Sequence, residues 1–133
     1  MKTLHRIFGV LVILAFLLTG QFMDFHHVRE MDDGARMMFR SRHIFILLAG
    51  LINLGVGVYF VYWRERWRKI LQMTGSMLLI IAPLMLTVAF FYEPTLKGLQ
   101  RPLTLPALVA LIIGVFFHLF SGMRQGKDST VVQ

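Results

Sequence analysis

Four apolar stretches of membrane-spanning length constrain this sequence more than any other feature. A helix needs about 20 consecutive apolar residues to cross a bilayer, within a range of roughly 17–25. The stretches that meet this condition are 7–23, 43–63, 70–92 and 103–122, and none of them contains Asp, Glu, Lys or Arg. A transmembrane β-barrel would need polar and apolar residues in alternation. These runs are continuously apolar, so the sequence predicts helices.

The composition places these helices in a membrane. Hydrophobic residues make up 56% of the 133-residue chain, against roughly 45–50% in soluble domains. The net charge of +7 would suit nucleic acid, but in a chain this apolar the basic residues typically flank membrane segments. We therefore exclude a nucleic-acid-binding domain and an ordinary cytosolic enzyme. The fold class that we predict is an all-α integral membrane protein, with the lipid bilayer as a partner and no nucleic acid.

The joint 64–69 predicts which side of the membrane each end of the chain occupies. It carries four Lys or Arg in six residues and is too short for anything but a tight turn at the membrane surface. Lys and Arg concentrate in cytoplasmic loops. A cytoplasmic joint makes both termini cytoplasmic, in an antiparallel four-helix transmembrane bundle that forms one domain, residues 1–133. We expect the membrane to be a bacterial inner membrane.

Two terminal segments have other possible interpretations. Lys2 and Arg6 before the first apolar stretch resemble the start of a signal peptide. The stretch is longer than a signal core and lacks a good cleavage site, so we expect it to be retained as a span. The tail 123–133 is polar, and we expect it to be mobile.

Small residues at helical spacing predict how the helices pack. Helices in lipid associate through small residues and buried polar groups. Such ladders occur in the second stretch (Gly50, Asn53, Gly57), the third (Gly75, Ala82, Ala89) and the fourth (Ala110, Gly114, His118, Gly122). The simplest interpretation is that these small residues serve helix packing alone and form no functional site. Pro83 lies mid-span and is expected to leave the carbonyl of Leu79 without its backbone donor.

A polar stripe before the second stretch is the first candidate site. If that helix starts early inside the joint 24–42, with Asp32 or Asp33 as N-cap, then Arg36, Arg40 and His43 share a face with Asn53. Tyr92 and Glu93 end the third stretch on the same outer side. This set suits an anionic head group, a carboxylate or a quinone oxygen, in an outer-leaflet pocket closed by Tyr92. The alternative is interfacial snorkelling plus an Arg–Glu pair that fixes helix register.

His118 is the second candidate, as a buried polar residue on a glycine-rich face. We expect it to lie against Gln72, Thr74 or Ser76, either as a hydrogen-bonded structural histidine or as part of a proton relay. It cannot share a haem with His43, because their depths differ by roughly 20 Å, whereas two axial ligands of one iron lie about 4 Å apart. Pairing with His5 would use the frayed start of the first helix. A haem with a single protein ligand, or a haem bound as a substrate, stays open.

Metal binding in the joint 24–42 is a further open alternative. The joint and its borders carry imidazoles, carboxylates and thioethers that suit zinc or copper. The imidazoles and carboxylates are Asp24, His26, His27, Glu30, Asp32, Asp33 and His43, and the thioethers are Met23, Met31, Met37 and Met38. Their spacing matches no recognised ligand motif, and the competing interpretation is a solvated loop.

The function that we predict first is non-enzymatic. The sequence has no cysteine and no P-loop, GxSxG, HExxH or GxGxxG pattern, beside well-developed packing faces. We expect a subunit or accessory of a membrane complex, as a homo-oligomer or with a partner membrane protein. The alternative is a redox or ligand-binding membrane protein whose outer-leaflet pocket takes quinone, haem or lipid.

Overall fold

The computed structural model describes residues 1–60, 65–96 and 100–122, and this part of the chain is all-helical. Its long helices are α1 (Lys2–Phe25), α2 (Asp33–Tyr59), α3 (Arg66–Tyr92) and α4 (Thr104–Gly122), and two 3₁₀ turns, η1 (Val28–Glu30) and η2 (Glu93–Thr95), follow α1 and α3. All four long helices are long and apolar enough to cross a membrane. The prediction of four such helices is confirmed. The expected end of the second stretch at Trp63 and the tail 123–133 lie outside the described residues.

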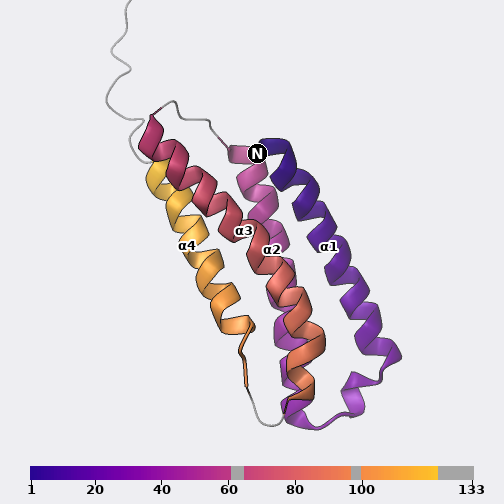
Figure 1. Cartoon of the computed structure of the whole chain (residues 1–133). Helices are drawn as coiled ribbons and strands as arrows, with labels where there is room; N and C mark the ends of the chain where they lie inside the picture. Colours follow the sequence, from indigo (N-terminus) through magenta and orange to yellow (C-terminus); the bar gives the residue numbers. More distant parts are fainter. Residues whose placement is uncertain (61–64, 97–99, 123–133) are drawn as a thin grey trace, which may run out of the picture.

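The helices lie side by side along one long axis (Figure 1). The closest pairs are α1 with α2 and α3 with α4, and the two pairs meet mainly through α2 and α3. The starts of α1 and α3 lie at the same end of the molecule as the ends of α2 and α4 (Figure 1). We call this the His5 end, and the opposite end, which carries η1 and η2, the Glu93 end.

The early start expected for the second helix is present. Asp32 is the N-cap of α2, and its carboxylate accepts a hydrogen bond from the backbone N–H of Ala35 at 3.0 Å. This is the usual way to satisfy an otherwise unpaired N–H in a first turn. Arg36 forms its ion pair with Asp33, three residues earlier on the same helix.

Glycines let the paired helices approach backbone to backbone. A Cβ on Gly57 of α2 would lie 2.8 Å from the backbone nitrogen of Arg6 in α1. A Cβ on Gly114 of α4 would lie 3.0 Å from the carbonyl oxygen of Gly75 in α3. Backbone atoms cannot move aside as a flexible side chain can. Both helix pairs therefore depend on these positions lacking a side chain, as small-residue packing in lipid requires.

The side chains between the helices are buried, and the outward faces of the helices are apolar. Ile46, Leu79, Leu86 and Phe90 are fully buried between the helices. The outward faces carry large apolar side chains, including Leu18, Leu84, Ile112 and Phe120. Such continuous apolar surface on every long helix is unfavourable in water and suits a hydrocarbon surrounding.

Candidate functional site

The first polar cluster lies at the His5 end and takes one side chain from each long helix. We call it the four-helix cluster; its members are His5 (α1), Asn53 (α2), Ser76 (α3) and His118 (α4). His5 Nδ1 lies 2.8 Å from Asn53 Oδ1, and His5 Nε2 lies 2.9 Å from Ser76 Oγ. Ser76 Oγ lies 3.2 Å from His118 Nε2. His5, Asn53 and Ser76 are fully buried, and the cluster joins all four long helices.

The partners of Asn53 determine where each proton lies for neutral imidazoles. Asn53 Nδ2 donates to the carbonyls of Ala49 (2.9 Å) and Leu79 (2.8 Å), so Asn53 Oδ1 is left to accept from the Nδ1–H of His5. His5 Nε2 is then an acceptor, and the hydroxyl of Ser76 donates to it. Since a serine has a single hydroxyl proton, Ser76 accepts from the Nε2–H of His118. The result is one directional chain of hydrogen bonds from α4 through α3 and α1 to α2.

Asn53 also compensates for the proline inside α3. Pro83 has no N–H, so the carbonyl of Leu79, four residues earlier, loses its donor within the helix. The amide of Asn53 donates to that carbonyl across the α2–α3 interface. A proline is tolerated in a membrane helix when a neighbouring helix satisfies the freed group in this way. The expected orphan carbonyl therefore exists, and its partner is a member of the four-helix cluster.

The second polar cluster, at the Glu93 end, is built around a buried carboxylate. We call it the Glu93 clamp. Glu93 Oε1 accepts from the backbone N–H groups of Leu103 (2.7 Å) and Thr104 (2.9 Å), so it caps the start of α4. Glu93 Oε2 accepts from the Thr104 hydroxyl and from Arg42 Nε, both at 2.5 Å. Arg42 also donates from Nη1 to the carbonyl of Met38 at 2.8 Å.

The Glu93 clamp is a desolvated ion pair that joins α2, α3 and α4. The side chains of both Arg42 and Glu93 are fully buried. A buried carboxylate and guanidinium compensate each other only when further hydrogen bonds satisfy their remaining polar atoms. The backbone N–H groups at the start of α4 supply such bonds to Glu93, and the carbonyl of Met38 accepts one from Arg42. Nη2 of Arg42 contacts Glu93 through the ion pair alone. This geometry suits a structural role, in which the ion pair fixes the ends of α2, α3 and α4 relative to one another.

Arg42 and His5 are residues of these clusters that the sequence reasoning did not place in a site. A helical repeat in the sequence indicates Arg42, because Arg42, Ile46, Ala49 and Asn53 follow each other at spacings of four, three and four. All four residues are buried. The predicted stripe, which passes through Gly50 and His43, lies about a quarter-turn around α2 from this buried face.

The structure distributes the predicted stripe over separate environments. His43 Nδ1 lies 3.0 Å from the hydroxyl of Thr19, and the His43 ring stacks on Phe16 at 4.0 Å, so His43 packs against α1. Arg40 is exposed, and 51% of Tyr92 is exposed. Asn53 belongs to the four-helix cluster, and the ion-pair partner of Glu93 is Arg42. The six proposed residues are therefore not brought together into one site in the part of the chain that the structure describes.

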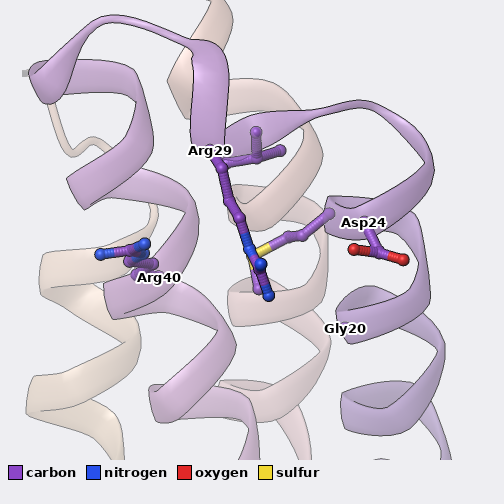
Figure 2. Close-up of a pocket in the computed structure, with 6 residues that line it drawn as sticks. Gly20, Asp24, Arg29 and Arg40 are labelled. Carbon is purple, nitrogen blue, oxygen red and sulfur yellow. The ribbon is translucent and has the colours of Figure 1, made fainter.

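A pocket does lie near one member of the stripe, Arg40. It has a volume of ≈ 240 Å³ between the end of α1, η1 and the first turns of α2 (Figure 2). Its lining residues are Gly20, Met23, Asp24, Val28, Arg29 and Arg40. This volume is below the roughly 300–1,000 Å³ of most small-molecule sites.

The structure differs from the sequence-based expectation about His5, which was that it lies in a frayed first turn of α1. The start of α1 is not frayed: the helix begins at Lys2 and His5 is fully buried. The rings of His5 and His118 lie 6.0 Å apart at nearly a right angle, with Ser76 Oγ bonded to both Nε2 atoms. The shared serine accounts for the burial of His5, because it satisfies the ring nitrogen that faces away from Asn53. His118 therefore has Ser76, one of its three expected neighbours, within hydrogen-bond distance.

The side chains of the joint 24–42 form local contacts. His26 Nδ1 lies 3.0 Å from the carbonyl of Phe22, and the ring stacks on that phenylalanine at 3.8 Å. His27 Nδ1 lies 3.8 Å from a carboxylate oxygen of Glu30, with both side chains largely exposed. Within residues 1–60, 65–96 and 100–122, no three His, Cys, Asp or Glu side chains converge on a possible metal position.

The fold and these clusters define the protein as all-helical, with four helices capable of spanning a membrane and polar side chains turned inward. No known protein family, no curated protein and no solved structure matches this chain. The chemistry of its own residues is therefore the basis for proposing a function.

Proposed function

We propose that the chain is a bacterial inner-membrane protein that forms an antiparallel four-helix transmembrane bundle with both termini in the cytoplasm. The apolar outward faces of all four long helices support a hydrocarbon surrounding. The hydrogen bonds within the four-helix cluster and the Glu93 clamp support it as well, because an unpaired polar group in lipid costs several kcal/mol. The Lys and Arg of residues 64–69 support the sidedness.

Labelling of single cysteines tests this topology, and the natural absence of cysteine makes the background clean. We expect Arg29→Cys, at the Glu93 end, to react with a membrane-impermeant maleimide in intact cells. Arg66→Cys, at the His5 end, should react only after the membrane is opened. Both positions are exposed. Equal labelling of the two cysteines in sealed cells would contradict the topology.

We propose further that the protein acts as a non-enzymatic subunit or accessory of a larger membrane complex. The observation that carries this proposal is the use of the buried polar groups. The side chains of the four-helix cluster and of the Glu93 clamp form hydrogen bonds between the helices of this chain. Their hydrogen-bonding groups therefore stabilise the fold. What the long helices present outward is apolar side chains, and in a membrane these contact lipid or another membrane protein.

Chemical cross-linking in membranes tests this role. The protein is expressed at its native level, cross-linked and then extracted in a mild detergent. We expect it to migrate as a homo-oligomer or with a partner membrane protein. In the control, membranes that have not been cross-linked are extracted into a denaturing detergent, and only the monomer should remain. A monodisperse monomer with no cross-linked partner would be evidence against the subunit role.

A further inference from the structure

The connection between α1 and α2, which includes η1, forms one side of the pocket beside Arg40. Several contacts fix the position of this connection. His27, between α1 and η1, has a φ of 49°, in the left-handed region, which turns the chain sharply back toward α2. Val28 anchors η1, since only 3% of it is exposed. The backbone carbonyl of Arg29 accepts a hydrogen bond from Arg36 Nη1 at 3.2 Å, and Arg36 is held by its ion pair with Asp33.

This loop places the side chain of Arg29 in the pocket. Figure 2 shows Arg29 reaching from η1 into the space between α1 and α2, with Arg40 on one side and Asp24 on the other. Gly20 contributes no side chain to the wall. The pocket is therefore lined by two guanidinium-bearing residues on separate elements and by the end of α1.

The charges of the pocket are unbalanced. Arg36 and Arg42, at the same end of the molecule, have carboxylate partners. Arg29 and Arg40 form no ion pair with any residue in the ranges 1–60, 65–96 and 100–122. Asp24 is the one acidic residue among the lining residues, so the pocket has a net positive charge. A guanidinium binds a phosphate group through two parallel hydrogen bonds.

The position of the pocket along the helices indicates the source of the phosphate. Gly20 and Asp24 lie in the last turns of α1, which ends at Phe25. In a spanning helix this level meets the headgroup region of the bilayer. We propose that the pocket binds the phosphate group of an anionic phospholipid, with Arg29 and Arg40 as the binding residues. Free phosphate shares this chemistry, and the membrane location is taken from the proposed function.

The test compares lipid binding in nanodiscs made of phosphatidylcholine with increasing phosphatidylglycerol, with retained lipid counted by native mass spectrometry. We expect the full-length protein to retain phosphatidylglycerol preferentially. Arg29→Gln with Arg40→Gln should weaken this retention about 10- to 30-fold, as expected for the loss of charge-assisted hydrogen bonds to one phosphate group. The matched control is Arg66→Gln with Lys69→Gln, the same charge change on exposed residues at the His5 end, which should retain the lipid.

Two further arms complete the test. Arg29→Lys with Arg40→Lys keeps the charge but loses the paired donors, so it should bind more weakly than the natural protein and more tightly than the glutamine variant. Inorganic phosphate is added to the protein in pure phosphatidylcholine; saturable binding there that the glutamine variant loses would support the site and assign it to a soluble phosphate.

The inference would be overturned by equal losses in the pocket variant and in the control at the His5 end. It would also be overturned if neither phosphatidylglycerol nor phosphate bound in preference to phosphatidylcholine. Since incorporation into pure phosphatidylcholine nanodiscs tests the membrane location by itself, a failure of the proposed function is distinguishable from a failure of this site.

Discussion

Glu93→Gln is expected to lower the free energy of unfolding by about 3–5 kcal/mol, the cost of leaving a buried charge without its partner. The glutamine oxygen can still accept from the N–H groups of Leu103 and Thr104, so the loss falls on the second oxygen, which binds Arg42 and the Thr104 hydroxyl. The measurement is reversible unfolding in mixed micelles with increasing denaturing detergent, followed by tryptophan fluorescence.

The decisive control is the double variant Arg42→Met with Glu93→Gln. It removes the buried guanidinium along with its partner, so no uncompensated charge is left, and we expect it to be more stable than either single variant. Glu30→Gln is the matched control for a carboxylate whose side chain is 80% exposed, and it should change stability by less than about 0.5 kcal/mol. Additive losses in the double variant would show that Arg42 and Glu93 do not act as a pair.

Asn53→Ala is expected to destabilise the protein by about 2–4 kcal/mol, because it leaves two buried groups without a partner, each costing about 1–3 kcal/mol. These groups are the Nδ1–H of His5 and the carbonyl of Leu79. The same unfolding experiment measures the effect.

Pro83 offers an internal test of this explanation. Pro83→Ala restores a backbone N–H at position 83 and so gives the Leu79 carbonyl a donor within α3. In that background Asn53→Ala should cost less than in the natural protein, by about 1 kcal/mol, the net contribution of one hydrogen bond. An unchanged cost would show that the amide of Asn53 does not compensate for the proline.

Much of the secondary structure could be predicted from the sequence, because it depends on local composition. The four long helices follow from four uncharged apolar stretches that are each long enough to span a membrane as a helix. The start of α2 at the Asp32 cap and the orphan carbonyl of Leu79 follow from the chemistry of single residues.

The two polar clusters required the tertiary structure. A choice among Arg36, Arg40 and Arg42 as the partner of Glu93 depends on how α2 is rotated about its axis, and a rotation of one residue changes which arginine faces inward. The burial of His5 depends on α1 beginning early and packing against α2 and α3.

The sequence by itself determined that four apolar helices form, where their polar joints lie and which carbonyl of α3 loses its donor, because these follow from short-range backbone and side-chain chemistry. Only the tertiary structure decided that Asn53 serves that carbonyl and His5, that Glu93 binds Arg42 and the start of α4, and that Arg29 reaches a pocket beside Arg40. These contacts join residues up to 51 positions apart, and their geometry depends on how closely the glycines allow each helix pair to approach.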